Sequence, residues 1–333
     1  MSRPASQLSQ TESAPATPLR FVTAASLFDG HDAAINIMRR LIQAQGVEVI
    51  HLGHNRSVLD IVQAAIQEDA DAIAISSYQG GHIEFFKYMV DLLNERGAGH
   101  IRVFGGGGGT ITPDEIRELE AYGVERIYHP DDGMHMGLVE MIEDVVERAA
   151  KHRVDTSLPG QLEPGDPAGI AHMLSALEDE VFSAAELELK RREWHGRSPQ
   201  APVLGITGTG GAGKSSVTDE LLNRFGQCFP DMNIAVLAVD PTRRRTGGAL
   251  LGDRIRMNSL RNPNLYMRSM ATRRQHLATS AILQDAIAFL RSTGFDLVIV
   301  ETAGIGQSDS EIVDMVDFPV YVMTSDFGAQ SQL

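Results

Sequence analysis

Residues 208–215 form a pattern that binds phosphate groups. They read Gly-Thr-Gly-Gly-Ala-Gly-Lys-Ser, which fits the spacing G-x-x-x-x-G-K-[ST] at every required position. Glycines in this motif let backbone N–H groups turn toward phosphate oxygens, while Lys214 can reach the β- and γ-phosphates and Ser215 can ligate Mg²⁺. The motif also fits a dinucleotide fingerprint, but the Lys-Ser pair has no role in binding a pyrophosphate. The candidate nucleotide-binding residues are Gly208, Gly210, Gly211, Gly213, Lys214 and Ser215.

Carboxylates end two apolar strands of the same half, one at Glu301 and one at Asp240. A carboxylate at such a strand end can hold Mg²⁺ directly or through water, and a glycine-containing loop after it can sense the γ-phosphate. Asp253 is a third candidate for the Mg²⁺ shell. The arginines 243–245, which precede Asp253, can neutralise phosphate charge, or they can belong to a solvated surface loop. With Lys214 upstream, we interpret Glu301 as a metal-binding and catalytic residue and Lys214 as its catalytic partner.

A histidine near the start of the chain lies in a setting typical of a metal-bound imidazole. Asp29, Gly30, His31 and Asp32 follow the first expected strand. The acid two residues before His31 can hold one ring nitrogen and leave the other nitrogen free for a metal. Taken alone, such a histidine is more often a loop or capping residue. Ser76 follows the third expected strand and the five glycines 105–109 follow the fourth, so all of these pieces project from one sheet edge.

Alternating strands and helices must position these residues. In the first half we expect strands at residues 21–25, 47–52, 72–76, 101–104 and 124–128, and amphipathic helices at 33–45, 58–67, 83–95, 113–122 and 136–149. Five βα units of this length predict a flavodoxin-like, doubly wound parallel sheet. Such sheets bind ligands outside the carboxyl ends of their strands, where the histidine and the glycines lie.

A second α/β unit follows a linker. Residues 1–18 predict a disordered tail and residues 19–150 the first domain. Residues 151–200 predict a linker and a solvated connecting helix at 168–194, and residues 201–333 a P-loop domain. In that domain we expect strands at 203–207, 235–240 and 295–301 and a helix at 215–225, and an apolar run follows at 318–323. The P-loop domain looks incomplete at its C-terminal end, because an uncovered parallel sheet would leave apolar faces exposed.

Composition excludes several classes of protein. The 333 residues contain 29 basic and 44 acidic side chains, for a net charge of −15, which argues against a nucleic-acid surface. No apolar run approaches the length of a membrane span, and no signal peptide opens the chain. A single cysteine, Cys228, excludes an internal disulfide framework and fits a reducing cytoplasm. We expect a cytoplasmic protein of two domains.

The first domain resembles the cobalamin-binding domains. Asp29-x-His31, then Ser76-Ser77-Tyr78, then Gly108-Gly109 are similar to their D-x-H-x-x-G, S-x-L and G-G signature. The resemblance implies that His31 is the lower cobalt ligand, that Asp29 and Ser76 support it, and that Gly108 and Gly109 line the channel for the cofactor's nucleotide tail. Two positions depart from the signature: Ala34 replaces glycine, and Tyr78 replaces leucine beside the tail pocket.

The second domain resembles the MeaB/ArgK group of G-protein chaperones. The matching stretches are 208–216, which adds Ser216 to the nucleotide-binding residues, and 239–241, 247–248, 251–253 and 301–307. The resemblance implies GTP and Mg²⁺ as ligands and a GTPase that gates delivery of adenosylcobalamin and protects a mutase. An Asn-Lys-x-Asp element for reading guanine is not present in these residues.

The two domains in this order resemble the N-terminal part of fused adenosylcobalamin-dependent acyl-CoA mutases. The resemblance implies a radical rearrangement between isobutyryl-CoA and n-butyryl-CoA, on a downstream mutase domain that binds the acyl-CoA. It also implies an adenosyltransferase as cofactor donor and a homodimer. The alternative is a stand-alone cobalamin carrier or sensor coupled to an NTPase switch. A P-loop chaperone for nickel is disfavoured, because no His- or Cys-rich donor segment is found.

Overall fold

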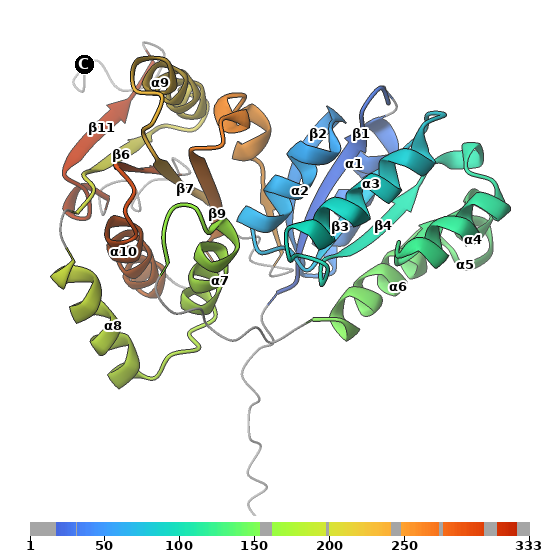
Figure 1. Cartoon of the computed structure of the whole chain (residues 1–333), viewed down its shortest axis with the longest axis horizontal. Coiled ribbons are helices and arrows are strands. Elements are labelled where there is room, and N and C mark those ends of the chain that lie inside the picture. The colour runs from blue at the N-terminus through green and yellow to red at the C-terminus, as the bar shows by residue number, and fades with distance from the viewer. Residues whose placement is uncertain are drawn as a thin grey trace, which may run out of the picture.

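A computed structural model shows two parallel α/β sheets side by side (Figure 1). The structure describes residues 18–30, 32–153, 162–197, 200–240, 248–272, 276–302 and 312–324. His31, Arg243, Arg244 and Arg245 lie outside these residues, as does the loop 303–311 after Glu301 and most of the predicted tail. Among the described residues, no helix is long and apolar enough to cross a membrane.

The first sheet has the strand order β5-β4-β3-β1-β2-β8, with every pair parallel. Its strands are β1 (Arg20–Ser26), β2 (Glu48–Arg56), β3 (Ala72–Ser76), β4 (Arg102–Gly106), β5 (Arg126–Tyr128) and β8 (Ala249–Leu251). The central strand β1 is buried along its whole length, as expected for a parallel strand covered on both faces. The five predicted strands and the parallel α/β fold are confirmed.

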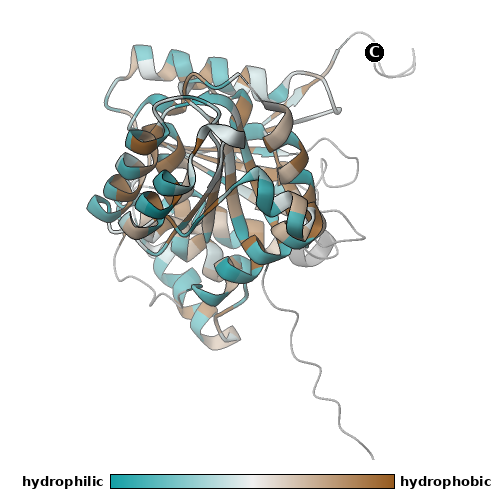
Figure 2. Ribbon diagram, turned by 90° about the vertical axis from the view of Figure 1, so that its right-hand side faces the viewer, coloured by the Kyte–Doolittle hydropathy of each residue, from teal (hydrophilic) through white to brown (hydrophobic). Residues whose placement is uncertain are grey.

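Helices cover both faces of this sheet. One hydrophobic cluster lies under α2 (Val58–Gln67), α3 (His82–Glu95) and α4 (Pro113–Tyr122), and another lies under α1 (Asp32–Ala44) and α6 (Leu138–Lys151). The helix predicted at 136–149 is confirmed as α6, but a short helix before it was not predicted. The chain forms α5 (Pro130–Met136) and then α6, because Gly137 at φ 87° ends one helix and begins the next. Most helices in Figure 2 carry both brown and teal turns, as helices between a core and solvent do.

The second sheet has the order β11-β6-β10-β7-β9. Its strands are β6 (Val203–Gly208), β7 (Ile234–Asp240), β9 (Leu265–Ala271), β10 (Leu297–Thr302) and β11 (Phe318–Val322). α9 (Lys214–Cys228) covers one face and α10 (His276–Ser292) covers the other. The three predicted strands are confirmed as β6, β7 and β10, and the apolar run at 318–323 forms β11, whereas β9 and α10 were not predicted.

The region between the sheets holds two helices where one was predicted. α7 (Pro167–Glu178) and α8 (Ala184–Gly196) are separated by a turn with Glu180 at φ 52°, after which Ser183 caps α8 in a capping box with Glu186. The prediction of a solvated connector is wrong for α7. Its residues Ile170 and Leu174 are fully buried in the core of the second sheet.

β8 crosses from one half of the molecule to the other. It follows β7 in the chain, yet it pairs with β2 of the first sheet, with Glu48 opposite Ala249 and Ile50 opposite Leu251. The first sheet therefore has six strands. A strand of three residues is too short to show an alternating pattern, so β8 could not be predicted from periodicity.

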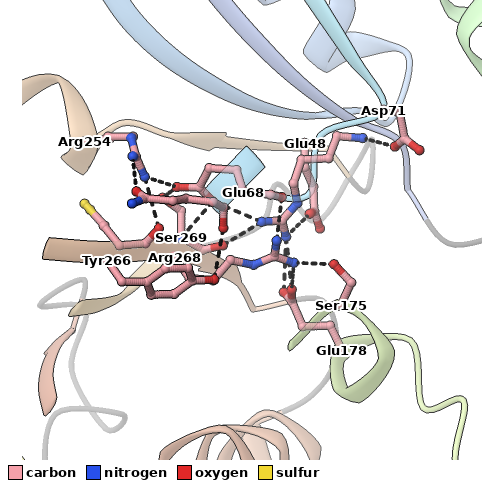
Figure 3. A network of polar contacts seen from close by, with 12 residues as sticks. Glu48, Glu68, Asp71, Ser175, Glu178, Arg254, Tyr266, Arg268 and Ser269 are labelled. Carbon is pink, nitrogen blue, oxygen red and sulfur yellow. Dashed lines mark hydrogen bonds and ion pairs between the residues drawn. The ribbon is translucent and has the colours of Figure 1, made fainter. Parts of the chain in front are cut away.

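A buried network of charged side chains joins the two halves (Figure 3). Arg20 of β1 donates to Glu48 at 2.8 Å and to Glu178 of α7 at 3.1 Å. Glu68, at the end of α2, pairs with Arg254 at 3.1 Å, and Arg268 of β9 pairs with Glu178. All six side chains are almost fully buried. Buried charges persist only when they are paired and hydrogen-bonded, so these groups fix how the two sheets meet.

Candidate functional sites

The phosphate-binding loop connects β6 to α9 and contains backbone positions that only glycine can occupy. Gly208 has φ 140°, and a Cβ there would lie 1.9 Å from the carbonyl oxygen of Val322. Gly211 and Gly213 have φ 81° and 93°, with open space where a side chain would stand. Lys214 begins α9, and its Nζ donates to the carbonyl oxygens of Gly208 at 3.0 Å and Thr209 at 3.1 Å. The loop thus wraps around the ammonium group.

Glu301, at the end of β10, reaches the start of α9. Its two carboxylate oxygens accept hydrogen bonds from the hydroxyls of Ser215 at 2.6 Å and Thr218 at 2.8 Å. The Ser215 hydroxyl also lies 3.4 Å from Oδ1 of Asp253. The structure therefore brings Ser215, Asp253 and Glu301 together. Thr218 was missed, although a polar residue one helical turn after Lys214 was a usable signal.

Asp240 at the end of β7 completes an acidic group that lies out of water. Burial, together with the charges of Asp253 and Glu301, raises the pKa of Asp240 to about 8. Burial also raises the pKa of Glu301, against the hydrogen bond from Ser215. Oδ2 of Asp240 is buried and has no hydrogen-bond partner among the described residues. A cation bound among these three carboxyl groups would offset their mutual repulsion and give the unpartnered oxygen of Asp240 a ligand.

These acids do not form a closed metal cage. Within the described residues, no group of three or more His, Cys, Asp and Glu side chains is arranged to hold a metal ion by itself. Mg²⁺ at nucleotide sites keeps several waters and takes only one or two protein oxygens besides the phosphates. The arrangement fits that kind of site.

A cavity of about 310 Å³ opens at the carboxyl edge of the first sheet. Its walls are mostly apolar and come from α1, α5, α6 and the ends of β3, β4 and β5. The residues that line the cavity include Ala34, Ser76, Tyr78, Gly108, Met141 and Ile142. Sequence reasoning identified Ser76 and Gly108 but missed the wall from α6, because amphipathic helix residues look alike whether they line a core or a cavity. Gly109 does not line the cavity.

Two glycines let the backbone close around this cavity. A Cβ on Gly107 would lie 2.3 Å from the carbonyl oxygen of Ser77, and one on Gly108, at φ 57°, would lie 2.7 Å from the ring of Tyr78. Tyr78 therefore packs directly over the glycine strip. A side chain at Gly107 would collide with the backbone of Ser77, whereas one at Gly108 would collide with the Tyr78 ring and strain the left-handed backbone.

Asp29 joins the loops after β1 and β3. It is buried, and its Oδ2 accepts a hydrogen bond from the backbone N–H of Tyr78 at 2.7 Å. The hydroxyl of Ser26, the last residue of β1, donates to Ser77 at 3.0 Å. Ser77 thus ties the two strand ends, while its neighbour Ser76 lines the cavity.

Two protein families match the two halves of the chain. Residues 19–139 match the B12 binding domain, and residues 175–333 match the methylmalonyl Co-A mutase-associated GTPase MeaB. The fold and the two sites therefore define a B12-binding domain joined to a MeaB-type GTPase domain.

Similarity to curated proteins is high over nearly the whole chain. It is 57% identical to fused isobutyryl-CoA mutase of Cupriavidus metallidurans over 96% of this chain and 29% of that protein, and 56% identical to that of Geobacillus kaustophilus over 96% and 30%. The chain matches one part of the fused isobutyryl-CoA mutases over nearly its whole length and spans about 30% of the length of these relatives. A solved cobalamin-binding protein from Desulfitobacterium hafniense is 20% identical over 39% of this chain and 58% of that one, with a TM-score of 0.34, too low to carry further meaning.

Proposed function

We propose that the chain is the cofactor-binding and GTPase part of an adenosylcobalamin-dependent isobutyryl-CoA mutase. The observation that carries the proposal is the apolar cavity beside the Asp29 loop, on the same chain as a complete phosphate-binding loop. Acyl-CoA would bind in a further domain of the complete protein. Isobutyryl-CoA and n-butyryl-CoA are the expected substrate and product. A homodimer in the cytoplasm, served by an adenosyltransferase, is part of the same proposal.

The first site would hold cobalamin through its lower face. His31 would be the cobalt ligand, with Asp29 as its supporting carboxylate. The cofactor's nucleotide tail would enter the 310 Å³ cavity, where apolar walls suit an aromatic base and where Ser76 and Gly108 line the channel. Adenosylcobalamin, when bound, supplies homolytic cleavage of the cobalt–carbon bond. The protein's share is to hold the axial ligand in place and to exclude water from the tail.

The second site would bind GTP and Mg²⁺. Lys214 would leave the carbonyl oxygens of its own loop for the β- and γ-phosphates, while the backbone of Gly208, Gly210, Gly211 and Gly213 and the Ser216 residue support the phosphates. Mg²⁺ would take Ser215 directly. Asp240, Asp253 and Glu301 would hold the ion directly or through water, and the positive charge of the ion would offset the repulsion between these carboxylates.

A titration of the purified chain with adenosylcobalamin, followed by absorbance, tests the first site. We expect tight binding with a base-off, histidine-ligated spectrum that His31→Ala abolishes. His195→Ala, an exposed residue of α8, is the matched control and should behave like the parent chain. A histidine-ligated spectrum that survives in His31→Ala would refute the cobalt assignment.

GTP binding tests the second site separately. Lys214→Ala should weaken binding of Mg²⁺·GTP by about 100-fold, equivalent to about 2.7 kcal/mol. Cobalamin binding should stay at the parent level. Unchanged nucleotide affinity in this variant would show that the loop does not bind phosphate as described.

A further inference from the structure

The turn after β8 touches the nucleotide site and the first sheet with three consecutive residues. Asp253 faces Ser215 at 3.4 Å. Arg254, which is almost fully buried, donates to Oε1 of Glu68 at 3.1 Å and to the carbonyl oxygen of Met267 at 3.0 Å. The side chain of Ile255 lies against the backbone of Gly53 in β2. A displacement of this 3₁₀ turn (Asp253–Arg256) therefore cannot stay local.

The contact between Ile255 and β2 is close on both sides. Gly53 has φ 84°, and a Cβ there would lie 2.7 Å from Cδ1 of Ile255, so only glycine lets the two approach. Arg56 then closes over the turn. Its guanidinium donates to the carbonyl oxygen of Ile255 at 3.4 Å and, through Nε, to that of Leu52 at 2.5 Å. The end of β2 and the turn thus form one packed unit.

The same end of β2 holds the loop that contains Asp29. Asn55 has φ 56°, and its Oδ1 accepts a hydrogen bond from the backbone N–H of Phe28 at 3.0 Å. The pairing of β1 with β2 is irregular here, since Ala24 lies opposite Gly53 but Ser26 lies opposite Arg56. A bulge of this kind re-aims a side chain toward a neighbouring site. Asn55 is therefore directed at the residue that precedes Asp29.

We propose that Asn55 is a positioning residue that couples the nucleotide site to the cobalamin site, through Asp253–Ile255 and Gly53–Arg56. When Mg²⁺ and nucleotide bind beside Ser215, they interact with Asp253 and shift the 3₁₀ turn. Asn55 shifts with the end of β2 and repositions the loop that leads to Asp29. The proposal rests on the proposed function, because it requires both ligands to bind this chain. Coupling between two sites is a free energy, so the test measures how each ligand changes the affinity for the other.

The buried charged network holds the 3₁₀ turn rigidly. Arg254 is held in place by Glu68, and Glu68 is held by Ser269 of β9 through hydrogen bonds of 2.9 Å and 3.0 Å (Figure 3). Because these groups are buried and mutually satisfied, the turn moves as a unit and not by separate side-chain rotations.

The experiment measures adenosylcobalamin affinity by absorbance, with and without Mg²⁺ and a non-hydrolysable GTP analogue. In the parent chain we expect the nucleotide complex to change that affinity by about fivefold or more. Asn55→Gly removes the acceptor but keeps the left-handed backbone, and should bring the ratio to about 1. Asn55→Asp keeps both the acceptor and the tolerated backbone, and should restore the parent ratio.

Reciprocity provides the readout that a merely structural role would not move. Adenosylcobalamin must change affinity for the GTP analogue by the same factor, and Asn55→Gly should abolish both effects while each ligand alone still binds. A parent ratio in Asn55→Gly would overturn the inference and leave the proposed function intact. A ratio of 1 in the parent chain, with both ligands bound, would do the same. Failure of either ligand to bind the parent would overturn the proposed function and this inference with it.

Discussion

Arg20, the first residue of β1, and Glu178, the last residue of α7, form an ion pair across the boundary between the two sheets, with 3.1 Å between the guanidinium and the carboxylate. Both side chains are almost entirely excluded from water, and Arg268 approaches the same carboxylate from β9. One carboxylate thus serves two arginines that lie far apart in the chain.

Glu178→Ala should therefore be strongly destabilising. It leaves two buried guanidinium groups without their shared partner, and removing one member of a buried ion pair costs about 3–5 kcal/mol. Urea unfolding of the purified chain measures the loss. Glu188→Ala, which breaks an exposed pair with Arg192 on α8, is the control and should cost at most about 1 kcal/mol. Equal effects of the two substitutions would contradict the role assigned to the network.

Gly208→Ala should damage the phosphate-binding loop. The new methyl group would collide with the backbone oxygen of Val322, which cannot rotate away, so we expect a loss of about 1–3 kcal/mol in stability and at least about tenfold in nucleotide affinity. Gly165→Ala is the control, since open space surrounds that position. Thermal unfolding and nucleotide titration of both variants check the prediction. Parent-like nucleotide binding by Gly208→Ala would show that the loop tolerates a side chain there.

Ala34→Phe should block the cavity without unfolding the domain. Ala34 is exposed on α1 and lines the cavity, so a ring there would occupy the space proposed for the nucleotide tail. We expect cobalamin affinity to fall about tenfold or more, with stability within about 0.5 kcal/mol of the parent. Ala44→Phe, exposed near the other end of α1, is the matched control. If both variants bind cobalamin equally, the cavity is not where the tail lies.

Asp69 should make stability depend on pH in the acidic range. Burial alone would raise its pKa, but the hydrogen bond with His172 and the charge of Arg268 outweigh burial and hold the pKa well below the ordinary value. A depressed pKa stabilises the folded chain above the unfolded value of about 3.9, and this stabilisation is lost as the pH falls below it. Asp69→Asn should therefore be less stable than the parent at pH 7, with the difference shrinking toward pH 3. A difference that is the same at both pH values would exclude this linkage.

Local sequence pattern predicted the central strands and the phosphate-binding loop. β3 and α4 begin and end where the apolar pattern begins and ends, and Lys214 was placed by motif spacing alone. The same reasoning could not find β9, because its buried residues include Arg268, whose charge is satisfied by Glu178 ninety residues earlier in the chain. Nor could it find Asn55, because a hydrogen bond between a strand end and a neighbouring loop leaves no periodic signal.

The placement of β8 means that the two domains are not interchangeable modules. A cut within residues 154–161 would separate the sequences cleanly, but the fragment before it would lose an edge strand of its own sheet. Its β2 would then present unpaired N–H and C=O groups along Glu48–Ile50, a surface that invites pairing with other chains. Recombination that exchanged either half for a homologous one would have to preserve this strand exchange. Inheritance of the two halves as a single unit is the expected outcome.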